Sequence, residues 1–186
     1  MKRVLIGLAL GAMALCSAQA VWAFGIQVDV PVAATLTSTP DNSAISKTTS
    51  SSGTTSGGMV GLNFGLLGIG YEDYSLSQKT NGQTSTFGVT MYDLALNLPI
   101  PVVNIAIGGG VGTGKLSGDA YSGITTHDAD LTQYFVQLGW PIGLMFDIHV
   151  GYRQLNGTNS LDIPLVGTVK VKQDAKVTTL GLRWGY

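Results

Sequence analysis

Residues 177–186 read Val177-Thr-Thr-Leu-Gly-Leu-Arg-Trp-Gly-Tyr186, and this stretch decides the fold class. Its apolar side chains alternate with small or polar ones. Leu180, Leu182, Trp184 and Tyr186 share one parity, whereas Thr179, Gly181, Arg183 and Gly185 share the other. Because successive side chains of an extended strand point to opposite faces, the stretch predicts a β-strand with one apolar face and one small, polar face.

The composition favours a barrel over a helical membrane protein. Charged residues make up 11% of the 186 residues, which is less than half of the roughly 25% usual in globular proteins. No run in the mature chain approaches the ~18 consecutive apolar residues that a transmembrane helix needs. A closed barrel is the other structure that satisfies every backbone polar group in lipid, so a transmembrane barrel is indicated.

Residues 1–23 have the pattern of a secretory signal peptide. Lys2 and Arg3 precede an apolar stretch, and cleavage is predicted after Ala20 or Ala23, with an uncleaved anchor as the alternative. The only cysteine, Cys16, lies in this segment, so the mature chain needs no disulfide. Cleavage leaves eight basic and eleven acidic residues, a formal charge of −3, which does not suggest nucleic-acid binding. We expect export by the general secretory route and one mature domain, residues 24–186.

Eight alternating segments follow in the mature chain, joined by connections that alternate between long and short. The expected strands are residues 24–36, 59–66, 67–77, 85–98, 101–114, 129–140, 143–155 and 174–186. The expected long loops are residues 37–57, 78–84, 115–129 and 156–173, with the option that residues 163–171 extend the flanking strands as a hairpin. Both ends of the domain are therefore expected at the end with the tight turns.

The first of these strands shows the alternation clearly. One face carries Phe24, Ile26, Val28, Val30, Val32 and Leu36, and the other carries Gln27, Asp29 and Thr35. Pro31 lies in the middle and cannot donate a ladder hydrogen bond. We therefore expect a local irregularity at Pro31.

An even number of antiparallel strands, with short turns at one end and longer loops at the other, is typical of bacterial outer-membrane barrels. The mature sequence resembles the small eight-stranded outer-membrane β-barrel proteins of the OmpA transmembrane-domain, OmpX and OmpW type. Its last strand is similar to the C-terminal assembly signal of such barrels. The matching positions are Thr179, Gly181, Trp184 and Tyr186.

This resemblance implies a fold, a location and partners. The fold is all-β, an eight-stranded antiparallel up-and-down transmembrane β-barrel that follows the N-terminal signal peptide. The location is the cell outer membrane of a Gram-negative bacterium. The implied partners are the outer-membrane lipids and lipopolysaccharide, the barrel-assembly machinery, and periplasmic chaperones in transit.

Aromatic residues gather near both ends of the expected strands. Phe24, Phe64, Trp140, Trp184 and Tyr186 lie near the tight turns, and Tyr71, Tyr74, Phe87, Tyr134 and Tyr152 lie near the long loops. Amphipathic rings prefer the boundary between lipid and water, so two girdles of exposed aromatic residues are predicted.

A secreted soluble barrel such as a lipocalin is the rival fold. Its apolar side chains would point inward, and its outer face would be rich in charged residues. The polar face of this chain instead carries small or uncharged residues, among them Gly108, Gly110, Gly112, Gln133, Gln137 and Gly139. Such residues suit the narrow interior of an eight-stranded barrel, which favours the membrane form.

Seven charged or titratable residues of the polar face are expected inside the barrel. Counted from the tight turns, Asp29, Glu72, Asp93, Asp147 and Arg183 form one layer, and His149 and Arg153 lie above it. Asn63, Asn97, Asn104 and Gln137 fall at or just below that level. Buried charges must be paired, so the layer predicts a polar network that plugs the lumen, with Arg183 and Asp147 as the expected ion pair. An ion path or gate is the alternative.

No cofactor, metal site or catalytic group is predicted. The candidates for an enzyme of outer-membrane lipids are His127, beside Asp128 and Asp130, and His149 in the lumen. The His-x-Ser pattern of the lipid A deacylases is absent, and two carboxylates do not make a metal site. Two functions remain, a structural or surface-interaction barrel and a narrow channel for small or apolar solutes. The glycine-lined upper lumen favours some hollow space, whereas the charged lower layer favours closure.

Overall fold

The computed structural model describes residues 24–41, 49–80, 82–100, 102–142, 145–164 and 166–185. The predicted signal peptide and Tyr186 lie outside these ranges. The long strands are β1 (Phe24–Pro40), β2 (Thr49–Phe64), β3 (Leu67–Thr80), β4 (Gln83–Ile100), β5 (Val103–Ser117), β7 (Ala129–Ile142), β8 (Phe146–Ile163) and β9 (Gly167–Gly185). A 3-10 turn, η1 (Asp119–Tyr121), and a short strand, β6 (Thr125–His127), lie between β5 and β7. None of the helices among the described residues is long and apolar enough to span a membrane.

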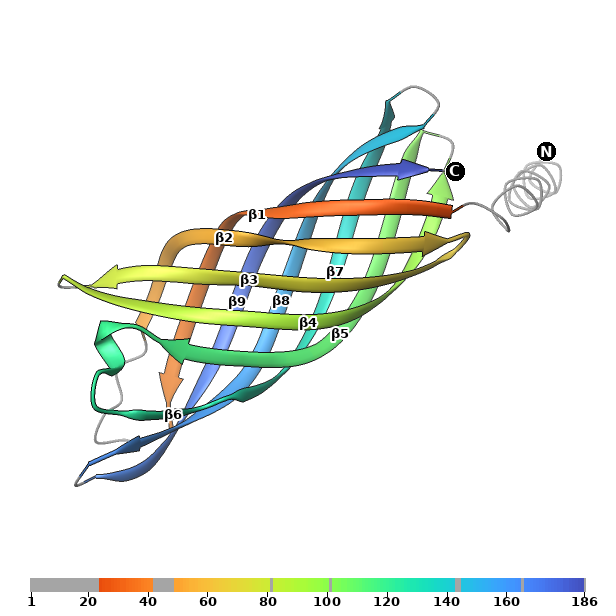
Figure 1. Cartoon of the computed structure of the whole chain (residues 1–186). Helices are drawn as coiled ribbons and strands as arrows, with labels where there is room; N and C mark the ends of the chain where they lie inside the picture. Colours follow the sequence, from red (N-terminus) through yellow and green to blue (C-terminus); the bar gives the residue numbers. More distant parts are fainter. Residues whose placement is uncertain are drawn as a thin grey trace, which may run out of the picture.

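The eight long strands form a closed ring. Their order is β8-β7-β5-β4-β3-β2-β1-β9, and β9 pairs with β8 to close it (Figure 1). Every pair of neighbours is antiparallel. The start of β1 and the end of β9 lie at the end of the short turns, as expected (Figure 1). The predicted eight-stranded antiparallel up-and-down barrel is confirmed.

The strands extend further than predicted at the end opposite the short turns, which we call the hairpin end. Ser38 pairs with Thr49 and Thr80 pairs with Gln83, so the loops predicted for residues 37–57 and 78–84 are largely strand. The stretch 115–129 contains the end of β5, η1 and β6. Ile163 pairs with Gly167, which confirms the optional hairpin over residues 163–171. Backbone pairing with a neighbour keeps these stretches extended although they contain few apolar residues.

The expected irregularity at Pro31 is present. The pairing of β1 with β9 shifts register between Pro31 and Ala33. A bulge of this kind inserts an extra residue and reverses which side chains face inward. Leu36 is consequently buried in the interior and Thr35 is exposed, the opposite of the predicted facing.

The outer surface of the ring is apolar over the region near the short turns. Leu94 is 70% exposed and Val111 is 63% exposed, and both point away from the interior. This facing excludes the lipocalin-like alternative. The exposed aromatic residues include Phe24 and Phe64, whose ring centroids are 5.5 Å apart, and Tyr71 and Tyr92, also 5.5 Å apart.

Two members of the predicted girdle near the long loops face the other way. Tyr74 and Phe87 are buried inside the barrel, whereas Tyr134 and Tyr152 are exposed on its surface. Tyr71 shares its parity along β3 with Asp73, not with Tyr74, so the facing of Tyr74 follows from strict alternation. The prediction was wrong at Tyr74 and Phe87 because it placed aromatic residues by height alone.

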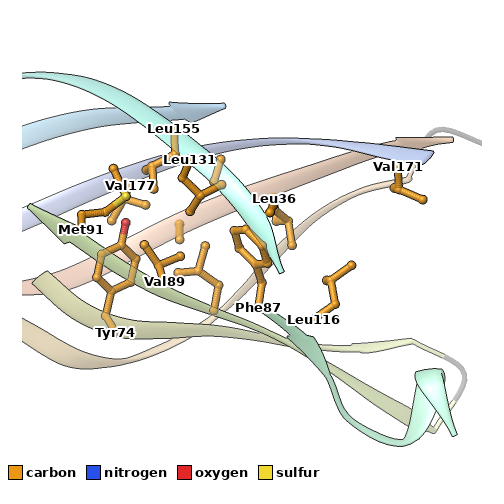
Figure 2. Packing of buried hydrophobic residues seen from close by; sticks show 14 of the residues in the cluster. Leu36, Tyr74, Phe87, Val89, Met91, Leu116, Leu131, Leu155, Val171 and Val177 are labelled. Carbon is orange, nitrogen blue, oxygen red and sulfur yellow. The ribbon is translucent and has the colours of Figure 1, made fainter. Parts of the chain in front are cut away.

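The interior is divided into two halves of different chemistry. We call the half near the short turns the polar half, because it contains all seven predicted charged residues. The half near the hairpin end is the apolar half. Its buried side chains come from every long strand and interdigitate across the barrel (Figure 2); they include Leu36, Met59, Tyr74, Phe87, Met91, Leu116, Leu131, Leu155, Val171 and Val177.

Candidate functional site

The charged side chains of the polar half form two groups, and a separate hydrogen bond of 2.9 Å joins Asn97 to Asn63. The first group is centred on Arg153 of β8. Its guanidinium forms ion pairs with Glu72 of β3 and with Asp93 of β4, the latter at 3.3 Å from Nη1 to Oδ2. The other carboxylate oxygen of Asp93 accepts a hydrogen bond of 2.5 Å from Nε2 of Gln133. The guanidinium also lies over the ring of Phe135, 4.4 Å from its centroid, so one cation contacts groups from three other strands.

The second group is centred on His149 of β8, which is completely buried. Its Nε2 lies 2.7 Å from Oδ1 of Asp29, and its Nδ1 lies 3.3 Å from Oδ1 of Asp147. Ionised carboxylates only accept hydrogen bonds, so His149 can donate to both only when both of its ring nitrogens carry protons. The imidazolium then supplies the positive charge between the two carboxylates.

Side-chain amides complete this second group. Gln27 donates to Oδ2 of Asp29 at 2.7 Å, and Gln137 donates to Oδ1 of Asp29 at 3.4 Å. Asn104 donates to Asp147. Buried carboxylates need several donors to replace water, and these amides, from β1, β5 and β7, provide them.

The position of Arg183 differs from the prediction. Arg183 and Asp147 face each other across β9 and β8, but no ion pair joins them among the described residues. Nη2 of Arg183 instead donates to Oε1 of Gln27 at 3.1 Å. Arg183 is half-buried at the edge of the polar half, whereas His149 lies between Asp29 and Asp147 rather than above the carboxylates. The predicted ion pair was wrong because the prediction considered only the heights of the two residues along their strands and not the directions in which their side chains extend.

Glycines on the interior face make room for the charged side chains. A Cβ on Gly110 would overlap Oδ1 of Asp93, and a Cβ on Gly139 would lie 2.5 Å from both carboxylate oxygens of Asp147. A Cβ on Gly181 would overlap Oδ1 of Asp29 and Nε2 of His149. Each glycine therefore lies directly beneath a carboxylate that reaches across from another strand.

The hollow space expected beside the glycines of β5 is occupied. A Cβ on Gly108 would overlap the ring of Phe135, and one on Gly112 would lie 2.7 Å from Sδ of Met91. A Cβ on Gly114 would lie 2.6 Å from Cζ of Phe87. Large side chains from the neighbouring strands thus fill the volume that these glycines leave, so the hollow space that the glycines favoured is not found beside them.

One small cavity lies between the two charged groups. Its volume is about 30 Å³, and its lining includes Asp29, Glu72, Asp93, Gln137 and Arg153. A volume of this size is on the scale of a single water molecule. Its lining includes none of Leu36, Phe87 and Leu131, which occupy the apolar half.

His127 lies outside the barrel interior, at the hairpin end. Its Nε2 is 2.8 Å from Oδ2 of Asp162 on β8, not paired with its sequence neighbours Asp128 and Asp130. Thr168 of β9 donates to Oδ1 of Asp162 at 2.6 Å. The hydrogen bond from Thr168, followed by that from His127, holds the pKa of Asp162 below its ordinary value of 3.8. This partner was missed because β6 pairs with β8 only in the folded hairpin.

The two histidines have different surroundings. His149 is enclosed by its two carboxylates, and His127 is exposed. In the part of the chain that the structure describes, no three His, Cys, Asp or Glu residues are arranged to hold a metal ion.

The residues of the predicted assembly signal point alternately inward and outward along β9. Thr179 and Gly181 are buried on the interior face, and Trp184 is exposed on the exterior. Tyr186 lies outside the described residues. Gly181 thus has a local role as well, because its position lies beneath the contact between Asp29 and His149.

Two solved outer-membrane proteins have a similar architecture. The crystal structure of Neisserial surface protein A (NspA) is 15% identical, with a TM-score of 0.63 over 88% of this chain and 99% of its own. The outer membrane protein AlkL, determined by solid-state NMR in lipid bilayers, is 11% identical, with a TM-score of 0.55 over 89% of this chain and 90% of its own. No family model and no curated protein matches the sequence. The chain has the fold of the small outer-membrane β-barrel proteins.

Proposed function

We propose that this protein is an integral barrel of the bacterial outer membrane. The apolar exterior supports this location, because a soluble barrel would leave side chains such as Leu94 and Val111 in water. The short turns then face the periplasm and the long hairpins face the medium. Lipopolysaccharide and the other outer-membrane lipids surround the barrel, and periplasmic chaperones and the barrel-assembly machinery deliver it.

We further propose that the lumen is closed and that the role is structural or surface-interacting rather than catalytic. The observation that carries this proposal is the filling of both halves of the interior. The ion-paired groups of Arg153 and His149 occupy the polar half, and packed side chains such as Phe87 and Met91 occupy the apolar half. A narrow channel for small or apolar solutes has less support, because side chains fill the space beside the glycines.

The hairpins that stand beyond the apolar exterior are the natural surface for such a role. Their exposed positions carry hydroxyl groups, and Ser56 and Ser75 are within hydrogen-bonding distance at 2.8 Å across β2 and β3. Paired backbone and cross-strand hydroxyl contacts hold these hairpins as extended sheet. A rigid sheet above the membrane presents a fixed surface to a partner.

Conductance in planar bilayers tests the closed lumen. The wild-type barrel is expected to give no discrete conductance steps, and a Phe87→Ala, Met91→Ala double variant is expected to increase ion leak by opening the apolar half. Leu94→Ala on the exterior of β4 is the matched control and is expected to leave the leak unchanged. Stable open channels in the wild type would overturn the closed lumen and favour the channel.

Single-cysteine labelling on intact cells tests the location. The mature chain has no cysteine after signal cleavage, so Lys79→Cys at the hairpin end and Val102→Cys at a short turn each provide one thiol. An impermeant maleimide is expected to label Cys at position 79 and not at position 102. Equal labelling of both, or labelling of position 102 alone, would contradict the proposed orientation.

A further inference from the structure

The exterior charges beyond the apolar surface are distributed unevenly around the barrel. The apolar surface ends at exposed tyrosines on β3, β4, β7 and β8. On most strands the next outward-facing position toward the hairpin end is an uncharged polar residue, including Thr90, Thr132 and Gln154. Strand β3 carries Asp73 there, and β7 carries Asp130 one position further. Lysines are concentrated on a different strand.

That strand is β9. Its outward-facing residues above Leu180 are Thr178, Lys176, Asp174, Lys172 and Lys170. Asp174 is the only acid among them, and it lies 3.3 Å from Nζ of Lys172. Lys170 and Lys176 form no ion pair within the described part of the chain. Three lysines against one aspartate leave this face with a net positive charge.

The flanking strands add hydrogen-bonding groups, and one acid, Asp41, follows directly after β1, where its backbone N–H donates to the carbonyl of Lys170 at 2.9 Å. Lys176 pairs in register with Thr35 of β1 and with Gln154 of β8. Lys172 pairs with Thr39 and Thr158. At about 3.3 Å per residue, Lys172 lies about 13 Å beyond Lys176 along the strand and Lys170 about 7 Å beyond Lys172. We call Lys170, Lys172 and Lys176 the lysine strip.

The lowest member of the strip is close to the edge of the apolar surface. Lys176 is the second outward position beyond Leu180, and its partner Gln154 is the next outward position beyond Tyr152. An aromatic residue at that height marks the boundary between hydrocarbon and headgroups. Lys176 therefore lies at headgroup height, and Lys172 and Lys170 lie further out.

We propose that the lysine strip, with its hydroxyl and amide flanks, binds the phosphate groups of an outer-leaflet glycolipid of the lipid A type. This inference rests on the proposed outer-membrane location. The ligand carries two anionic phosphates at headgroup height, where Lys176 lies, and its polar sugar portion extends outward toward Lys172 and Lys170. A second copy of this chain fits less well, because a two-fold contact through β9 would place the same positive strip against itself.

Lipid retention measures this binding. The barrel is reconstituted into phosphatidylcholine nanodiscs that contain a small fraction of bisphosphorylated lipid A, and the lipid kept on the protein is counted by native mass spectrometry. Each lysine near an anionic surface contributes on the order of fivefold in binding. The Lys170→Gln, Lys172→Gln, Lys176→Gln variant is therefore expected to retain lipid A at least about tenfold more weakly than the wild type.

The matched control removes lysines from the other side of the barrel. Lys79 of β3 and Lys115 of β5 are also exposed at the hairpin end, so Lys79→Gln with Lys115→Gln is expected to leave retention unchanged. Wild-type retention is expected to fall with added salt and to be lost with dephosphorylated lipid A.

Three results would overturn the inference. They are equal retention by the triple variant, an equal loss in the control variant, and equal binding of dephosphorylated lipid A. Preferential binding of soluble inorganic polyphosphate over lipid A would assign the strip to a soluble polyanion instead. Insertion is measured separately by heat-modifiable migration. An inserted barrel that does not select lipid A overturns this inference alone, whereas a chain that never inserts overturns the proposed location as well.

Discussion

The two halves of the barrel interior satisfy buried side chains by different means. In the polar half each charged group depends on a few partners from other strands, as Glu72 and Asp93 depend on Arg153. In the apolar half no single contact dominates, and side chains such as Met91 and Leu131 fill the space collectively. The central residues of both halves are shielded from bulk solvent, since His149 and Met91 are each completely buried.

The difference shows that one narrow lumen can be filled both by ion-paired polar side chains and by packed apolar side chains. Burying a charge costs several kcal/mol unless its partners are present, so the polar half requires specific residues. Packing requires the right volume and tolerates exchange among apolar residues. Substitutions in the polar half should therefore destabilise the barrel according to the chemical identity of the side chain, and substitutions in the apolar half according to the change in side-chain volume.

The largest expected effect comes from removing the central cation of the polar half. Arg153→Met leaves Glu72 and Asp93 buried without their counter-charge, which is expected to lower the free energy of unfolding by about 3–5 kcal/mol. Urea unfolding from lipid vesicles measures the loss. A triple variant that adds Glu72→Gln and Asp93→Asn to Arg153→Met should recover much of that loss.

Arg183→Met is the comparison variant. Its loss of unfolding free energy should be below about 2 kcal/mol, because the Arg183 guanidinium donates to an amide rather than pairing with a carboxylate. Equal losses for both arginines would contradict the assignment of Arg153 as the central cation.

A smaller effect is expected from a cavity in the apolar half. Met91→Ala should cost about 2–3 kcal/mol, within the range for removing a large buried aliphatic side chain. Met91→Leu conserves most of the volume and should cost less than about 1.5 kcal/mol. The same unfolding measurement compares them. If Met91→Leu were as damaging as Met91→Ala, identity rather than volume would govern this half as well.

Gly181 probes the space beneath the His149 group. Gly181→Ala places a methyl group against Asp29, His149 and the backbone oxygen of Val28, so a loss of about 1–2 kcal/mol is expected. Gly88→Ala on the exterior of β4 is the control, because its Cβ would meet only the backbone oxygen of Lys115 at 3.8 Å. An unchanged unfolding midpoint for Gly181→Ala would show that the group can shift to make room.

The smallest effect is expected outside both halves, at Asp162. Its lowered pKa means that its stabilising contacts are present above the ordinary value of 3.8 and are lost as the pH falls through the lower folded value. Thr168→Val removes the main cause and should raise the pKa of Asp162 toward 3.8. NMR titration of the side-chain carboxyl measures the shift, with His127→Gln as the companion variant. A larger rise in His127→Gln than in Thr168→Val would reverse the order of the two causes.

The sequence predicted the strands and the side of each strand that faces inward, except where tertiary contacts intervened. The inward facing of Asp29, Asp93 and Asp147 followed from period-two alternation. The facing of Leu36 did not, because the bulge after Pro31 reverses the parity and its size depends on the pairing with β9. The lengths of the hairpins were also underestimated, since hydroxyl-rich stretches gain their extended form from neighbouring strands.

By itself, the sequence determined that this chain forms an eight-stranded barrel with an apolar exterior and charged residues inside. Alternation is a local property of the strand, and the eight predicted strands carry it, apart from the reversal after Pro31. Only the tertiary structure decided that Arg153 rather than Arg183 neutralises carboxylates, that His149 lies between Asp29 and Asp147, and that Phe135 and Met91 fill the space beside the glycines of β5. These contacts depend on the tilt and closure of the sheet, which bring together side chains from strands that are distant in sequence.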